Sequence, residues 1–360
     1  MVLDQMHRRD FLNPRHAART AGHVLGALEE LAPDEGAPAP PTEISLLRLA
    51  WRAMATRFEI VVPFATEDAC AAGQDAFGLL DELEDQMTVY RDHSEVCGIN
   101  RLAFRRSVRV ESKLFELLMT SRRVWEETDG AFDVTAHALI DAWGFFRGPR
   151  RVPSEEERLA ALACVGMRHV TLDEAKKSIR FALDGIELNL GSIGKGYALD
   201  RMAERLRQTW RLPSALLHGG GSSMYAIGSP PDERRGWLVR LRHPWQQERS
   251  LAGVWLQDRA MGTSAATYRH LIHEGKKLGH VLDPRTGWPA GGMASVSVVA
   301  PNAALADALS TAFYVGGLDV ARRYCEAHPE VGAVLLPEGG EVVVFGLKPS
   351  EFTLCLTGQP

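Results

Sequence analysis

Hydrophobic positions in the chain follow two different periods from about residue 51 onward, which predicts a mixture of strands and helices. Polar and apolar residues alternate at Arg57–Val62, as expected of a strand. The segment Asp68–Tyr90 predicts a helix of about six turns, because its apolar residues recur at helical spacing along one face. Further helices are expected at Lys113–Thr128 and at Pro153–Cys164, where Ser154 is a candidate N-cap before three glutamates.

The remaining periodic segments are short. Strands are expected at His169–Leu172, Ser178–Phe181, Ile186–Leu190, Ala215–His218, Trp237–Leu241, Gly253–Gln257, Ser295–Ala300, Gly332–Leu336 and Glu341–Phe345. Helices are expected at Gly196–Thr209, Ala303–Tyr314 and Asp319–His328. Because strands come in runs and helices at intervals, the pattern predicts an α+β fold with antiparallel sheets and packed helices in a single compact unit. No apolar stretch reaches the roughly 18 to 20 residues of a transmembrane helix.

The first 45 residues have a different pattern from the rest. The run Arg8-Arg9-Asp10-Phe11-Leu12 is similar to a twin-arginine export signal. Charged residues and histidines interrupt the region that should be apolar, however, and no A-x-A-like cleavage site follows. The other interpretation is an amphipathic arm with a proline-rich linker at 32–42. The expected organisation is an arm and linker over residues 1–45 and one folded domain over residues 46–350.

Composition narrows the class of partner. The 360 residues carry 41 Lys plus Arg against 46 Asp plus Glu, a formal net charge of -5. A nucleic-acid-binding protein would be expected to be basic, so a small ligand is the more plausible partner. The cysteines are odd in number, far apart and without a C-x-x-C pair, which argues against a disulfide framework or a zinc site. The chain also contains 33 glycines, and the segments in which they cluster are the next candidates for a ligand site.

Two glycine-containing segments are ambiguous when each is taken alone. Thr128–Thr135, followed by Trp143-Gly144-Phe145, is typical of a helix C-cap and turn. Glu187–Asp200 passes from a predicted strand through glycines into a helix, an arrangement that presents backbone N–H groups to phosphate. It matches neither the P-loop nor the dinucleotide-binding glycine pattern. A phosphate-binding loop and a plain tight turn both remain open.

A third segment, His218-Gly219-Gly220-Gly221, is similar to the oxyanion loop of lipases. No G-x-S-x-G nucleophile motif accompanies it, so the hydrolase interpretation is disfavoured. The fourth constellation pairs the predicted turn His280–Gly287 with Asp307 and Thr311, four residues apart on a predicted helix. A carboxylate beside a hydroxyl is an oxygen ligand set that Mg²⁺ accepts together with water and phosphate. Such pairs in helices usually bind nothing when they stand alone.

Taken together and in order, these segments resemble the ApbE family of flavin transferases. The resemblance runs from about Met54 to Gly317. It is carried by Met54-Ala55-Thr56, Tyr90 with Ser94 and Asn100, Thr128–Thr135 with Trp143-Gly144-Phe145, Gly191–Asp200, Gly219–Gly221, Thr263-Ser264, His280–Gly287 and Asp307–Thr311. An ApbE-like fold is therefore expected.

The resemblance implies a Mg²⁺-dependent FAD:protein FMN transferase, which moves FMN from FAD to a Thr of an acceptor flavoprotein and releases AMP. Asp307 and Thr311 match the family's metal ligands, with Ser192 as a third, and Asp307 also belongs to the catalytic pair. The other member of that pair, His280, matches a histidine proposed to take the proton from the acceptor Thr. The positions that match flavin-nucleotide contacts are Met54, Ala131, Phe132, Asp133, Asn189, Lys195, Gly220 and Val281.

Four positions depart from the family's usual pattern. Ala55 and Ala265 stand where glycine is common, and Asn189 and Ser222 stand where aspartate is common. An alanine fits such a position without strain only if its backbone φ is negative. Hydrogen bonds from Asn and Ser can replace part of the lost carboxylate contacts, so a competent site is favoured over a relic.

Two other functions remain open on the same scaffold. One is Mg²⁺-dependent hydrolysis of FAD to FMN and AMP, and the other is a non-catalytic FAD-binding role suggested by the four departures. An exposed or cleft carboxylate is expected at position 307, so that Asp307→Ala would abolish activity and leave the fold intact. The cytoplasm is the favoured location, with twin-arginine export to the periplasm as the alternative.

Overall fold

An eight-stranded antiparallel sheet forms the centre of the computed structural model, which describes residues 45–354 except 232, 247, 266–269 and 274. Its strands run in the order β1 (Leu46–Ala53), β2 (Thr56–Pro63), β6 (Ala215–Gly219), β7 (Ser223–Ile227), β10 (Ala260–Ser264), β13 (Met293–Ala300), β14 (Gly332–Pro337) and β15 (Val343–Phe345). The antiparallel pairing confirms the predicted arrangement. The predicted arm and linker lie outside the described residues, except for Ser45.

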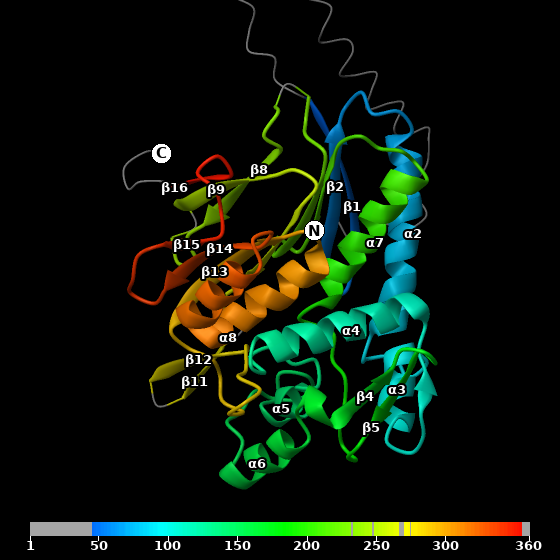
Figure 1. Cartoon of the computed structure of the whole chain (residues 1–360), viewed down its shortest axis with the longest axis vertical. Helices are drawn as coiled ribbons and strands as arrows, with labels where there is room; N and C mark the ends of the chain where they lie inside the picture. Colours follow the sequence, from blue (N-terminus) through cyan, green and yellow to red (C-terminus); the bar gives the residue numbers. More distant parts are fainter. Residues whose placement is uncertain (1–44, 232, 247, 266–269, 274, 355–360) are drawn as a thin grey trace, which may run out of the picture. The chain divides into compact units, whose positions relative to one another are not determined.

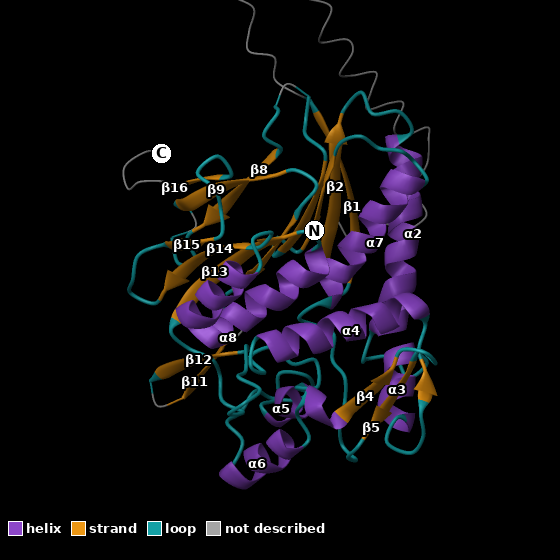
Figure 2. Cartoon of the chain, viewed as in Figure 1, coloured by secondary structure: helices purple, strands orange, loops and turns teal. Residues whose placement is uncertain are grey.

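Helices cover one face of this sheet, as Figures 1 and 2 show. Alternation along β2 turns Phe58, Ile60 and Val62 toward them, and each of these side chains is at most 1% exposed. The main core therefore lies between the sheet and the helices, where apolar surface is removed from water. The helices against the sheet are α2 (Ala69–Met87), α7 (Gly194–Gln208) and α8 (Ala303–Ala327), and α4 (Ser112–Glu127) packs on α8.

The other face of the sheet carries a second, smaller core. Val61 points to this face, where Trp237 and Val239 cover it. These two side chains come from a three-stranded antiparallel sheet in which buried and exposed residues alternate along the first strand. That sheet consists of β8 (Trp237–Arg242), β9 (Ser250–Leu256) and β16 (Phe352–Leu354).

A third group of elements lies beyond α4, in the lower part of Figure 1. It contains α3 (Glu95–Leu102), α5 (His137–Ala142), α6 (Glu155–Ala163), the 3₁₀ turn Met167–His169, the three strands β3 (Val108–Arg109), β5 (Ser178–Phe181) and β4 (Val170–Asp173), and the hairpin β11 (His270–His273) with β12 (Lys276–Gly279). Leu139, Trp143 and Leu282 share a small core here. This core joins α5 to the turn that follows the hairpin.

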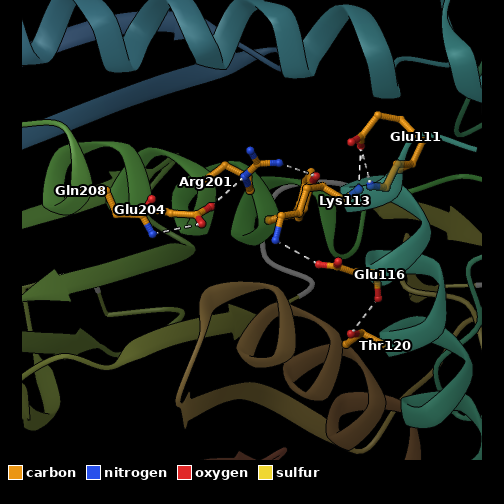
Figure 3. Close-up of polar contacts among 9 residues, drawn as sticks. Glu111, Lys113, Glu116, Thr120, Arg201, Glu204 and Gln208 are labelled. Carbon is orange, nitrogen blue, oxygen red and sulfur yellow. Dashed lines mark hydrogen bonds and ion pairs between the residues drawn. The ribbon is translucent and has the colours of Figure 1, made fainter.

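Side chains at helix ends explain where several helices begin. Ser154 and Glu157 form a capping box at the start of α6, which confirms the predicted N-cap. Glu111 plays a similar part for α4, because one of its carboxylate oxygens accepts hydrogen bonds from two backbone N–H groups. Figure 3 shows this cap beside α7, where Arg201 bonds Glu204. None of the described helices combines the length and apolarity needed to cross a bilayer.

The structure corrects two predicted elements. The predicted strand Ile186–Leu190 is a loop, because it finds no strand to pair with and makes only one isolated bridge, from Glu187 to Ala136. The predicted helices 303–314 and 319–328 belong to one element, α8, with a break at Gly317, whose φ is 72°. Sequence periodicity also missed the mostly exposed edge strand β1 and the short strands β7 and β10.

Candidate functional site

Asp307, on the second turn of α8, is the centre of the candidate site. Its side chain is buried, with only 4% of the residue exposed. The oxygen Oδ2 accepts hydrogen bonds from the backbone N–H of Gly196 at 2.9 Å and from the Ser223 hydroxyl at 2.8 Å. The Lys195 ammonium lies 3.8 Å from the same oxygen. Within the described residues no hydrogen bond engages the other oxygen, Oδ1.

Two glycines allow the backbone to come this close to Asp307. A Cβ on Gly262 of β10 would lie 2.5 Å from the carbonyl carbon and oxygen of Ala306. A Cβ on Gly196, at the start of α7, would lie 2.0 Å from the carbonyl oxygen of Ala303. Both contacts are with backbone atoms, which cannot move aside as a flexible side chain would. Asp307 is therefore held between β10 and α7 by main-chain packing.

The electrostatic setting of Asp307 combines burial with a nearby cation. Burial raises the pKa of Asp307, while Lys195 and the donors from Ser223 and Gly196 lower it. Asp307 is thus not an exposed carboxylate, because it lies among packed elements. A second positive charge at this carboxylate would favour its ionised form.

A group of hydroxyls lies one turn further along α8. Thr311 bonds the Asp307 carbonyl at 3.3 Å, so the predicted spacing does place both residues on one face. Its Oγ1 is also 3.3 Å from the Ser264 hydroxyl of β10, which in turn is 2.8 Å from Ser310. The described residues contain no cluster of three or more His, Cys, Asp or Glu side chains able to hold a metal. A cation here would rely on one carboxylate and neutral oxygens.

The start of α8 is fixed from α7 by Asp200. Its carboxylate accepts hydrogen bonds from the backbone N–H groups of Ala303 at 2.6 Å and Ala304 at 2.8 Å. These are free donors of a helix N-terminus, which favour a carboxylate. Burial nevertheless raises the pKa of Asp200 to about 7. Asp307 follows one turn later, so its position depends on this clamp.

The Gly-rich loop and the first turn of α7 contain three predicted site residues. Asn189 accepts a hydrogen bond from the Gly191 N–H at 2.9 Å, and its amide nitrogen lies 3.0 Å from Nδ1 of His137. Lys195 is in the first turn of α7, where it reaches Asp307. Ser192 is partly exposed between them. The loop thus enters the helix N-terminus as the glycine spacing predicts, and leads to the carboxylate.

The segment Ala131–Asp133 follows α4 and is almost entirely buried. Both oxygens of Asp133 are engaged internally, with Thr135 at 2.6 Å and with the backbone N–H of Met167 at 3.1 Å. Burial raises the pKa of Asp133, against the effect of its hydrogen bonds to Thr135. A cavity of about 350 Å³ borders Asp133, and Trp125 and Arg285 also line it. The Asp133 carboxylate therefore has a structural role in this segment, and Asp133 is the residue of the segment that borders the cavity.

Met54 and Ala55 form the turn between β1 and β2, and both adopt a left-handed backbone, with φ of 49° and 57°. Such a turn matches the twist of a hairpin but favours glycine or asparagine. The condition that Ala55 has a negative φ is therefore not met. Gly220, with φ of 63°, packs against Thr56 of the same turn. The strained turn thus lies directly beside Gly220, a predicted nucleotide contact.

His280 and Val281 lead from β12 into the predicted turn at 283–287, which the structure confirms through two backbone bonds to the Asp283 carbonyl. The His280 ring packs edge-on against Phe145, with centroids 6.5 Å apart. The Trp143 indole N–H donates to the Gly287 carbonyl at 2.9 Å. The motif Trp143-Gly144-Phe145 therefore supports this turn, 144 residues away in the chain.

The structure brings Lys195, Asp307 and Thr311 into one group around the start of α7. None of the contacts described above joins His280 or Ser192 directly to this group. Sequence reasoning missed Ser223 and His137, although both touch predicted site residues. Ser223 follows the run of three glycines, which is the one local signal that could have found it.

Comparison with known proteins places the chain among relatives of known name. The sequence model of the ApbE family matches residues 54–335. The FAD:protein FMN transferase of Klebsiella pneumoniae is 27% identical over 296 residues, which cover 82% of this chain and 90% of that protein. The FAD:protein FMN transferase of Escherichia coli K12 is 30% identical over 253 residues, which cover 68% of this chain and 70% of that protein.

Solved structures show the same arrangement of elements. The crystal structure of the ApbE protein from Thermotoga maritima superposes with a TM-score of 0.76 at 27% identity, covering 83% of this chain and 96% of that one. The apo form of the flavinyl transferase ApbE from Pseudomonas stutzeri superposes with a TM-score of 0.72 at 26% identity, covering 85% and 98%. The α+β fold with antiparallel sheets is thus shared with these proteins.

Proposed function

The chain belongs to the ApbE family, and from that premise we propose that it is an FAD:protein FMN transferase that uses Mg²⁺ and attaches FMN to a Thr of an acceptor flavoprotein. The observation that carries the proposal is the Asp307 group. A buried carboxylate, one oxygen of which has no hydrogen bond from the described residues, a lysine at 3.8 Å and the N-terminus of α7 are gathered in one place. Reactions that divide a pyrophosphate are catalysed mainly by positioning and by neutralising charge, which this group can supply.

The donor set fits a small hard cation. Asp307 and Thr311, with an oxygen from Ser192, would hold Mg²⁺ by oxygen alone, while substrate phosphate and water complete its shell. When bound, the ion would draw negative charge from the pyrophosphate. Lys195 would bind the same phosphates as a point charge, and the Gly-rich loop would offer backbone N–H groups at the start of α7.

The proposed reaction balances in one transfer. The acceptor Thr oxygen forms a bond to the phosphorus of the FMN half, the phosphorus–oxygen bond to the AMP half breaks, and AMP leaves with the electron pair. His280 takes the proton of the Thr hydroxyl. Trp143 and Phe145 hold the His280 turn, so that the base approaches from a supported backbone.

The test is direct. The protein is incubated with FAD, Mg²⁺ and an acceptor flavoprotein domain carrying the target Thr, and the products are separated on a denaturing gel. Covalent flavin fluorescence on the acceptor is expected, with none on a Thr→Ala acceptor. AMP is expected in equal amount to attached FMN. Bound FAD without labelling of several acceptors would contradict the proposal, and AMP release without an acceptor would indicate hydrolysis instead.

A further inference from the structure

A line of polar contacts outside the Asp307 group runs from Glu187 through His137 to the Gly-rich loop. His137, the first residue of α5, is only 6% exposed. Its Nε2 lies 3.2 Å from Glu187 Oε2, and its Nδ1 lies 3.0 Å from Asn189 Nδ2. Asn189 Oδ1 in turn accepts the Gly191 N–H at 2.9 Å. One imidazole therefore connects α5 to the loop.

The chemistry of the partners fixes which atom donates at each step. A carboxylate only accepts, so Nε2 of His137 carries the hydrogen that it gives to Glu187. Nδ1 of the neutral ring then has a lone pair and accepts from the Asn189 amide N–H. The amide oxygen faces the other way and accepts from Gly191. Every group in the line has a matching partner only when His137 is neutral.

Ring packing holds the same imidazole from the side. Phe146 contacts His137 edge-on, with centroids 4.5 Å apart and planes at 73°. Tyr90 stacks on Phe146 at 4.8 Å, and the Arg147 guanidinium lies 4.8 Å from the centroid of the Phe146 ring. Aromatic contacts of this kind have a preferred geometry and restrict the ring. The line of hydrogen bonds therefore begins from an imidazole with little freedom to turn.

We propose that neutral His137 is a positioning residue that holds the loop at Asn189–Gly191 in its FAD-binding form, so that protonation of His137 releases the loop and weakens FAD binding. The inference rests on the proposed function in one respect, because it takes FAD as the ligand of the loop.

Protonation changes the direction of one hydrogen bond. A cationic ring carries a hydrogen on Nδ1, which then faces the N–H donors of the Asn189 amide. The amide must turn over to present its oxygen to His137, and the Gly191 N–H loses its acceptor. The charged groups around the ring are Glu187, Asp141 and Arg147. Burial lowers the pKa of His137, against Glu187 and Asp141, so the neutral form prevails at pH 7.

Two variants distinguish the effect of the Nδ1 hydrogen-bond acceptor of His137 from the effect of its ring. His137→Asn keeps an oxygen where Nδ1 stands and removes the titration, whereas His137→Phe keeps a ring and removes the acceptor. Hydrogen exchange of residues 187–196 is measured in the full-length protein without FAD, and is corrected for the intrinsic effect of pH. FAD affinity is measured at pH 8 and pH 5.5 by fluorescence quenching. His328→Phe, in which the replaced histidine stacks on Tyr324 far along the chain, is the control.

At pH 8 the His137→Phe protein is expected to exchange the loop about tenfold faster than wild type and to bind FAD about tenfold more weakly. The His137→Asn protein is expected to stay within about twofold of wild type at pH 8 and to keep its affinity at pH 5.5. Wild type is expected to weaken there by less than about tenfold, because the lowered pKa of His137 leaves part of the rings neutral. His328→Phe leaves both loop exchange and FAD affinity at the wild-type values.

Three results would overturn the inference. Loop exchange that is unchanged in His137→Phe would show that the acceptor does not hold the loop. An acid loss of FAD affinity that persists in His137→Asn would show that another group titrates, and a loop-exchange change in His328→Phe would remove the specificity. Because the exchange measurement needs no FAD, a protein that binds no FAD refutes the proposed function while the loop result still decides the positioning role.

Discussion

The two halves of the candidate site are held by different means. Asp307 is held mainly by main-chain packing of α7, α8 and β10, which approach so closely that two glycines are required, while the Asp200 carboxylate clamps the start of α8. The Gly-rich loop around Asn189 is fixed by side chains, through His137 and Glu187. Backbone packing has one stable arrangement, whereas a side-chain hydrogen bond can reverse when a proton arrives. The first half therefore supplies fixed charge, and the second half is open to adjustment by pH.

The largest effect is expected from removing the charge in the fixed half. Asp307→Asn keeps the size and an acceptor oxygen but loses the negative charge, so FMN transfer should fall by about a hundredfold or more. Transfer is measured by gel fluorescence, and folding by thermal denaturation. Asp319→Asn, which changes an exposed carboxylate of the same helix, should transfer at the wild-type rate. Transfer above a tenth of the wild-type rate in Asp307→Asn would contradict the role of this carboxylate.

A second large effect is expected from adding a side-chain atom where β10 packs closely against α8. Gly262→Ala places a Cβ against the Ala306 carbonyl, so the free energy of unfolding should fall by about 1–3 kcal/mol. Gly98→Ala is the matched control, because nothing lies within 4 Å of its Cβ. The control should be neutral or stabilising by up to about 1 kcal/mol, since alanine favours a helix. Equal denaturation midpoints for the two variants would mean that β10 and α8 can separate without loss.

Replacing the side-chain amide of Asn189 should change how FAD affinity depends on pH. Asn189→Asp offers carboxylate oxygens to both Gly191 and His137, so it should raise the pKa of His137 from its lowered value. The neutral ring is then no longer required, and FAD affinity at pH 5.5 should stay within about twofold of its value at pH 8. Titration of FAD at the two pH values tests this. An acid loss as large as that of wild type would show that Asn189 does not sense His137.

The smallest effect concerns backbone strain beside the site. Ala55 has a φ of 57°, so Ala55→Gly should raise the free energy of unfolding by about 0.5–1 kcal/mol. Ala50→Gly, on exposed strand β1, should lower it by a similar amount, because glycine weakens an extended segment. Chemical denaturation of both proteins measures the pair. If both substitutions lowered the free energy of unfolding, the left-handed backbone at Ala55 would not be strained.

Local patterns predicted much of the fold. The capping residue Ser154, the strand at Ser178–Phe181 and the helix at Lys113–Thr128 follow from near neighbours in the chain, and each agrees with the structure within one or two residues. The spacing of four residues on a predicted helix likewise placed Asp307 and Thr311 on one face. The loop at Ile186–Leu190 was predicted as a strand because alternation alone does not say whether a partner strand exists.

Other site residues could not be predicted from the sequence, because they act across long separations. Ser223 meets Asp307 over 84 residues, and His137 meets Asn189 over 52. The sequence offers no local signal for His137, and for Ser223 it offers only the preceding run of glycines. The burial of Asp307 was missed for the same reason, since the elements that cover it come from three distant segments.

The hydrogen bond from Gly196 to Asp307 spans 111 residues, and this separation bears on how the protein assembles. Contacts between distant parts of a chain form late, because the entropy of closing a long loop must be lost before the contacts stabilise the fold. Helices α7 and α8 can each be helical long before they touch. During refolding, helical circular dichroism should therefore recover before FAD binding does, and the delay between the two signals measures how slowly the last tertiary contacts form.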